Sequence, residues 1–284
     1  MRSLRDAISA NEGTGTALWH FNFSELAAVK AAARLVRESG RPIVLGVSEG
    51  EREYVGVRTA AALVAAYRKE GIPLYLNADH TKSFEKIREA VEAGFDAVIF
   101  DGSALPFEEN IAETKRVVEY IRMADSRIVI EGEVGYIGVS SKILDAVPTG
   151  IEKTSVEQAV RFVRETGVDM FAPAVGNIHG MLKGGHEPEL DIALIRKIKE
   201  ALRQDRGGPV PLVLHGASGN TDDDLRAAVE AGISLIHVNT ELRVAWRKAL
   251  DAAFAAHPEE TTPYKLLESA EDAVYAVMRA KASL

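Results

Sequence analysis

The strongest constraint on the fold is a regular alternation, along nearly the whole chain, between strand-like apolar runs and amphipathic helical stretches. The runs that we interpret as strands span residues 17–23, 43–48, 73–80, 97–103, 127–135, 169–180, 211–218 and 234–240. Several helical stretches between them end on glycine, the residue expected just past a helix. Eight such units, with strands rich in valine, isoleucine and leucine, predict an α/β fold, the (β/α)8 or TIM barrel.

Two further helices are predicted outside the eight units, near residues 2–10 and 262–281. The 284 residues are enough for one large barrel and no linker-like stretch divides them, so residues 1–284 are expected to form a single domain. A doubly wound open sheet is the alternative. It is disfavoured because its phosphate-binding GxGxxG pattern is missing after the first strand.

The composition narrows the classes of partner. A net charge of −8 argues against broad nucleic-acid binding, so any affinity for phosphate must be local. The absence of cysteine removes disulfides, thiolate ligands and cysteine nucleophiles. The apolar stretches are too short and too often broken by charge for a membrane span, and the N-terminal residues lack the apolar core of a signal peptide. These features predict a cytoplasmic protein that binds neither nucleic acid nor membranes.

Three of the strand-like runs lead to a histidine at their ends: His80, His179 and His215. The carboxyl ends of the strands meet at one face of a barrel, so residues far apart in sequence converge there. Three imidazoles with one coordination position left open are typical of a catalytic metal site. Because the set contains no thiolate, Zn²⁺ is the expected ion, with Co²⁺, Fe²⁺ and Mn²⁺ as alternatives. The amidohydrolase type of barrel is disfavoured, because it needs a His-x-His on its first strand and this chain has only His20 there.

Carboxylates accompany these histidines. Asp79 precedes His80, and a turn of the backbone at the strand end would let both side chains face the site. We interpret Asp79 as a catalytic acid–base group, and the alternative is a cap for the helix that follows. Asp101 and Glu133 are either partners that fix the histidine rings around the metal or members of ion pairs in the barrel mouth.

Small residues that can bind a phosphate group follow the histidines. Turns rich in glycine and serine present backbone N–H groups and hydroxyls, and phosphate sites after the seventh and eighth strands are common in barrels. The residues predicted to bind phosphate are Gly180, Lys183, Gly216, Ser218, Asn239 and Thr240. A long connection at residues 138–154 follows the fifth strand and is expected to cover the same face as a lid.

Six segments together carry a resemblance to a known family. They are NADH (77–80), DGSALPFEENI (101–111), EGEVG (131–135), GNIHGMLKG (176–184), LVLHGASG (212–219) and VNTELRVAW (238–246). In these segments the chain resembles the class II, metal-dependent fructose-bisphosphate aldolases and the related ketose-bisphosphate aldolases. The resemblance extends in order from about residue 4 to about residue 250.

The resemblance implies a barrel enzyme, a lyase, that cleaves a ketose phosphate such as fructose 1,6-bisphosphate to dihydroxyacetone phosphate and an aldehyde. By the family pattern the three histidines bind zinc, with Asp101 and Glu133 close to the metal. Asp79 would be the acid that handles the aldehyde oxygen. Gly180, Lys183, Gly216, Ser218 and Thr240 would hold the dihydroxyacetone phosphate end, with a monovalent cation nearby. The resemblance also implies a homodimer or a homotetramer.

Two positions depart from the family pattern. The family's lid carries a glutamate that moves a proton of the dihydroxyacetone phosphate fragment, and this chain has Ser141 at that position. Asp145 and Glu152 are the only carboxylates of the lid, and Asp145 is the better placed because Glu152 adjoins the next helix. The family's strand-eight asparagine is replaced by His237, which we interpret either as a proton-transfer group or as a hydrogen-bond donor in place of the amide.

These departures leave two alternatives to the cleavage of fructose 1,6-bisphosphate. The first is aldol chemistry or epimerisation of a different sugar phosphate. The second is a sugar-phosphate-binding protein without turnover, against which the intact Asp79 and the three histidines argue.

Overall fold

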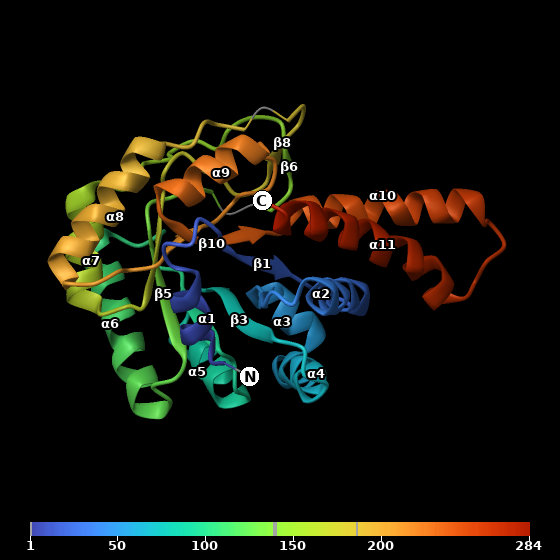
Figure 1. The fold of residues 1–284 in the computed structure, drawn as a ribbon, viewed down its shortest axis with the longest axis horizontal. Helices are drawn as coiled ribbons and strands as arrows, with labels where there is room; N and C mark the ends of the chain where they lie inside the picture. Colours follow the sequence, from blue (N-terminus) through green and yellow to red (C-terminus); the bar gives the residue numbers. More distant parts are fainter. Residues whose placement is uncertain (1, 139–140, 186) are drawn as a thin grey trace.

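Eight parallel strands close into a barrel in the computed structural model, which describes residues 2–138, 141–185 and 187–284 (Figure 1). The strands are β1 Leu18–Asn22, β2 Ile43–Val47, β3 Leu74–Thr81, β4 Ala97–Phe100, β5 Val129–Val134, β7 Met170–Pro173, β9 Leu212–Leu214 and β10 Ile233–Val238. Around the barrel they follow the order β1, β10, β9, β7, β5, β4, β3, β2. The prediction of a (β/α)8 barrel is confirmed.

Helices surround the barrel, and most of them connect successive strands (Figure 1). They are α1 Leu4–Asn11, α2 Leu26–Ser39, α3 Glu49–Val55, α4 Val57–Lys69, α5 Phe84–Ala93, α6 Phe107–Ala124, α7 Val156–Thr166, α8 Ile192–Arg206, α9 Asp222–Ala231, α10 Thr240–Ala256 and α11 Pro263–Ala282. The two expected terminal helices are α1 and α11. Helix α11 packs against α10 and α2, and α10 and α11 extend together away from the barrel (Figure 1). Within the described residues, no helix combines the length and the apolarity needed to cross a membrane.

The interior of the barrel changes from apolar to polar along the strands. Side chains two residues apart on a strand share one face, so the interior is built in layers. A buried apolar cluster packs with α1 and includes the first layer: it contains Leu18, Val44, Tyr75, Ala97, Val129, Met170, Ala172, Val213 and Leu235. Two positions further along five of these strands come buried polar residues: His20, Asn77, Glu131, His215 and His237. The polar layer lies nearer the carboxyl ends of the strands, where a barrel carries its active site.

Several strands end earlier than predicted. Strand β7 ends at Pro173, so His179 lies in the following loop and not at the end of a long strand over 169–180. The backbone leaves the sheet after Pro173, and Gly176 in the following loop has a φ of 103°. Asp101 and His215 likewise come directly after β4 and β9.

A second, two-stranded sheet lies outside the barrel. Its strands are β6 Ile143–Leu144 and β8 Met181–Leu182, which pair in parallel. Strand β6 belongs to the predicted lid over residues 138–154, of which residues 139 and 140 lie outside the described residues. The pairing therefore joins the lid to the loop that carries His179.

Candidate active site

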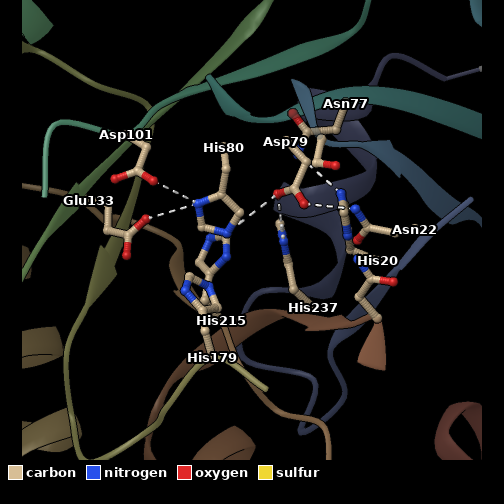
Figure 2. Close-up of polar contacts among 12 residues, drawn as sticks. His20, Asn22, Asn77, Asp79, His80, Asp101, Glu133, His179, His215 and His237 are labelled. Carbon is tan, nitrogen blue, oxygen red and sulfur yellow. Dashed lines mark hydrogen bonds and ion pairs between the residues drawn. The ribbon is translucent and has the colours of Figure 1, made fainter. Parts of the chain in front are cut away.

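Three histidines from different parts of the chain meet at the carboxyl end of the barrel (Figure 2). His80 lies on β3, His179 in the loop after β7 and His215 directly after β9. One ring nitrogen from each lies within 4.8 Å of the other two. The ring centroid of His80 is 4.6 Å from those of both His179 and His215. The structure thus brings together the three residues that the sequence singles out as metal ligands.

Carboxylates hold the ring of His80. Its Nδ1 lies 3.1 Å from Oδ2 of Asp101 and 3.5 Å from Oε2 of Glu133 (Figure 2). Asp101 is itself fixed, because its other oxygen accepts a hydrogen bond from the hydroxyl of Ser103 at 2.6 Å. Asp101 and Glu133 therefore occupy the positions expected of residues that orient a metal-binding imidazole.

The other two rings are fixed in the same way. Nδ1 of His179 lies 2.6 Å from the carbonyl oxygen of Gly138, and Nε2 of His215 lies 2.7 Å from Oε1 of Glu131. The remaining nitrogen of His179, Nε2, is buried without a hydrogen-bond partner among the described residues. One nitrogen of each ring is thus anchored and the other is free for a ligand bond. This donor set fits a divalent metal ion.

Negative charge surrounds His80. Burial alone would lower the pKa of His80, but Asp79 and Asp101 raise it to about 10. Burial and the neighbouring Asp101 raise the pKa of Glu133 to about 7. By contrast, burial together with His80 and His215 lowers the pKa of His179 to about 3, so its ring is neutral. The site favours a positive charge, and a metal ion would replace the proton of His80.

A local irregularity of β3 directs both Asp79 and His80 into the site. The register of β3 against β4 shifts between Ala78 and Thr81, and His80 has a φ of 40°. Such a conformation is rare for a residue with a side chain and occurs where a functional geometry requires it. The expected turn of the backbone at this strand end is therefore observed.

Asp79 is buried among polar partners. Its Oδ2 accepts a hydrogen bond from the amide of Asn22 at 2.8 Å, and its Oδ1 lies 3.9 Å from Nε2 of His80. Burial would raise its pKa, yet His80 and then His237 lower it well below the ordinary value, so the carboxylate is ionised. The helix that follows is capped by Ser83, whose hydroxyl accepts from Lys86 N. The alternative interpretation of Asp79 as a helix cap is therefore wrong.

His237 lies beside Asp79 at the end of β10. Its Nδ1 is 3.5 Å from Oδ1 of Asp79, and its ring centroid is 4.1 Å from that of His215. Burial, with His20 and His215 next to it, lowers the pKa of His237 well below its ordinary value, so the ring is neutral. His237 thus lies against both the acid–base candidate and a metal-ligand candidate.

Most of the predicted phosphate-binding residues line one cavity with the histidines. They are Gly180, Gly216, Ser218, Asn239 and Thr240. Gly216 has a φ of 61°, and a Cβ there would lie 2.1 Å from the carbonyl oxygen of Ile178, so only glycine fits. The hydroxyl of Ser218 accepts hydrogen bonds at 3.3 Å from the backbone N–H groups of Asn239 and Glu241, at the start of α10. The amino terminus of α10 therefore adjoins the cavity, and a helix amino terminus attracts anions.

The lid places its residues differently from expectation. Ser141 lines the cavity, and its carbonyl oxygen accepts a hydrogen bond from Arg243 at 3.0 Å. Asp145 is exposed and lies 3.8 Å from the ammonium group of the equally exposed Lys183. Neither is among the residues that line the cavity, and Glu152 is exposed as well. The geometry gives no support to Asp145 as a base or to Lys183 as a phosphate ligand, because both side chains reach into solvent.

Sequence reasoning missed Glu131, Asn22 and Asn77, and it gave His20 no role. Two of them lie on a strand at an even spacing from a residue that was recognised: Glu131 two before Glu133, and Asn77 two before Asp79. Period-two spacing on an inward face could have identified these two. His20 and Asn22 lie two residues apart on β1, where no residue had been given a role. The carbonyl of Gly138 carries no such signal, since any residue has one.

The family model for "Fructose-bisphosphate aldolase class-II" matches residues 2–284. A fructose-bisphosphate aldolase of Geobacillus stearothermophilus is 34% identical over 269 residues, which cover 93% of this chain and 90% of the relative. One from Staphylococcus aureus strain Mu50 is 34% identical over 283 residues, covering 98% and 95%. The crystal structure of the YdjI aldolase from Escherichia coli K12 superposes with a TM-score of 0.82 at 27% identity, covering 99% of this chain and 96% of that one. The chain therefore belongs to the class-II fructose-bisphosphate aldolase family and is an aldolase, a lyase.

Proposed function

We propose that this protein is a zinc-dependent aldolase that reversibly cleaves a ketose phosphate to dihydroxyacetone phosphate and an aldehyde. The observation that carries the proposal is the convergence of three histidines, each with one anchored nitrogen, beside the ionised Asp79. Fructose 1,6-bisphosphate is the first substrate to test, since relatives at 34% identity bear the name of that activity. The cytoplasmic location, the homo-oligomeric state and a monovalent cation stay predictions.

The metal would be held by His80, His179 and His215. Three imidazoles without a thiolate favour Zn²⁺, and Co²⁺, Fe²⁺ or Mn²⁺ are the alternatives. When bound, the ion supplies Lewis acidity that stabilises negative charge on the carbonyl oxygen of the ketose. Asp101, Glu131 and the Gly138 carbonyl keep the rings in their tautomers and orientations.

The phosphate of the dihydroxyacetone end would bind at the amino terminus of α10. Gly216 and Ser218 line the cavity there with Asn239 and Thr240, and Gly180 completes the wall beside His179. Backbone N–H groups and the helix dipole attract an anion at this place. The binding energy of the phosphate would fix the reacting carbons of the substrate against Asp79 and His237.

Two proton transfers accompany the cleavage. The ionised Asp79 takes the proton from the hydroxyl of the carbon that becomes the aldehyde, and the carbon–carbon bond breaks. The electron pair stays on the dihydroxyacetone phosphate fragment, whose carbon then needs a proton. The neutral ring of His237, whose Nδ1 lies 3.5 Å from Oδ1 of Asp79 on the cavity side, would receive the proton from Asp79 and pass it to this carbon, so we assign that transfer to it.

A different sugar phosphate is the second candidate substrate. The observation that favours it is that Ser141 in the lid and His237 on β10, the two positions that depart from the family pattern by the sequence resemblance, both line the cavity. Both border the place where the reacting carbons would lie. A protein with these changes could also epimerise a sugar phosphate by reforming the broken bond on the opposite face.

A panel of ketose monophosphates and bisphosphates, assayed with Zn²⁺ and again after chelation, tests the proposal. We expect release of dihydroxyacetone phosphate from at least one ketose phosphate, loss of the activity on chelation and its return with Zn²⁺. An epimerised sugar without free dihydroxyacetone phosphate would select the second candidate. Binding without any conversion across the panel would refute an aldolase role.

The His237→Asn variant separates proton transfer from hydrogen bonding. An amide can donate a hydrogen bond but cannot titrate, so exchange of solvent protons into dihydroxyacetone phosphate is expected to fall by about tenfold or more. The measurement is the rate of deuterium incorporation at fixed zinc content. Exchange close to the wild-type rate would make His237 a structural donor only.

Asp145→Asn is the matched carboxylate variant in the lid. Because the side chain of Asp145 is exposed and lies outside the cavity, we expect the same exchange rate to stay within about twofold of wild type, far less than the loss of a general acid or base. A drop comparable to that of His237→Asn would instead place Asp145 in the reaction, as the sequence first suggested.

A further inference from the structure

The rings of His20 and His237 stack on one another inside the barrel (Figure 2). The two residues are register partners on the adjacent parallel strands β1 and β10, so their side chains share one face. Their ring centroids are 3.6 Å apart and their planes differ by 3°. Both side chains are buried. The stack is therefore a fixed feature of the polar layer.

The surroundings of His20 hold its ring in place. Nε2 of His20 lies 3.1 Å from the side-chain nitrogen of Asn77, within hydrogen-bond distance. Gly46 on the neighbouring strand β2 leaves the space that the ring occupies, because a Cβ at that position would lie 2.0 Å from Cε1 of His20. The position of His20 is thus defined from two sides.

His237 has no such anchor of its own. Neither of its ring nitrogens has a hydrogen-bond partner among the described residues. Oδ1 of Asp79 is 3.5 Å from Nδ1, longer than a well-formed hydrogen bond. Contact with the rings of His20 and His215 is what remains to orient it. Packing, and not hydrogen bonding, sets the direction of the His237 ring.

We propose that His20 is a positioning residue, which by stacking holds the ring of His237 with Nδ1 toward Asp79. The inference rests on the proton-transfer role proposed above for His237. A metal ion shared by the two rings explains the pair less well. The lone pairs of imidazole lie in the ring plane, and two stacked, nearly parallel planes do not direct them at one ion.

The direct test is the environment of the His237 ring. Isotope labelling of the seven histidines makes their ring signals visible by NMR, and the signal missing in His237→Asn assigns residue 237. A stacked ring shifts this signal through its ring current. We expect the shift to be lost in His20→Gln, which can still reach Asn77 but has no ring, and to be largely kept in His20→Phe. An unchanged His237 signal in His20→Gln would overturn the proposal.

A double-mutant cycle tests the consequence for the reaction. In the wild-type background His20→Gln is expected to lower proton exchange by about tenfold at unchanged KM and zinc content, as misplacement of a reacting group does. In the His237→Asn background the same change should alter exchange by less than about twofold, because residues that act through one another are not additive. His20→Phe should restore most of the exchange in the wild-type background.

The outcomes distinguish the two proposals. Equal losses from His20→Gln in both backgrounds would mean that His20 only supports the barrel, which ends this inference. If His237→Asn lowers exchange but His20→Gln does not, the inference fails and the role of His237 stands. If His237→Asn leaves exchange at the wild-type rate, the proton-transfer role of His237 is refuted, and with it the positioning role of His20 that rests on it. Should His20→Phe not fold, the cycle with His20→Gln decides alone.

Discussion

We expect that alanine in place of any one of His80, His179 and His215 reduces bound zinc from about one ion per chain to a small fraction of an ion. Turnover should be abolished in each variant. A site with three protein ligands keeps only two after the change, too few for the tetrahedral coordination that Zn²⁺ prefers. The anchoring groups, such as Asp101 and Glu131, would then face an empty position. The measurement is metal analysis of each purified variant after dialysis against a weak chelator.

His257→Ala is the matched control for this series. His257 is exposed and lies directly after α10, so its loss should leave zinc content unchanged. Full zinc occupancy in one of the three site variants would remove that residue from the ligand set. Full zinc occupancy in all three variants would refute a metal centre formed by these histidines.

Asp79→Asn is expected to lower kcat by roughly 10² to 10⁴, the usual contribution of one acid–base group. The substitution is almost isosteric, and an amide oxygen at residue 79 can still accept the hydrogen bond from Asn22. Zinc content and substrate affinity should therefore be retained while the proton acceptor is lost. The measurement compares kcat, KM and bound zinc with those of the wild type.

Ser83→Ala provides the contrast to Asp79→Asn. Ser83 is the cap of α5, so its loss should reduce the free energy of unfolding by about 1 kcal/mol without an effect on kcat. A variant Asp79→Asn that loses stability and keeps its kcat would reverse these two assignments. Retention of kcat in Asp79→Asn would by itself refute the catalytic role of Asp79.

Local sequence patterns were enough to predict the barrel and the meeting point of its histidines. A strand-like run followed by a helical stretch repeats eight times along the chain. The topology of a barrel then brings the strand ends together, whatever their separation in sequence. The same reasoning predicted that Asp101 and Glu133 lie at strand ends in the barrel mouth, and it left open whether they hold the histidine rings or form ion pairs. This prediction required only the direction of each strand and the knowledge of which alternate residues point into the barrel.

The lid and the inner polar layer could not be predicted in the same way. Asp145 and Lys183 lie in loops, where no period tells which way a side chain points, and both reach into solvent. The Gly138 carbonyl that holds His179 is a backbone group without a sequence signature. The stacking of His20 on His237 depends on the register between the first and last strands, which pairs residues more than two hundred positions apart. Long-range register and loop direction are tertiary properties.

The lid is tied to the candidate metal centre through its own backbone. The Gly138 carbonyl orients the ring of His179, and the β6–β8 pairing fastens the lid to the loop that carries this ring. If the proposed substrate shifts the lid when it binds, it would also shift the affinity of the site for the proposed ion. Linkage would make the effect reciprocal, because the ion would then change substrate affinity by the same factor. Under the proposed function, the affinity for the metal would then differ between the empty enzyme and the enzyme that holds a ketose phosphate.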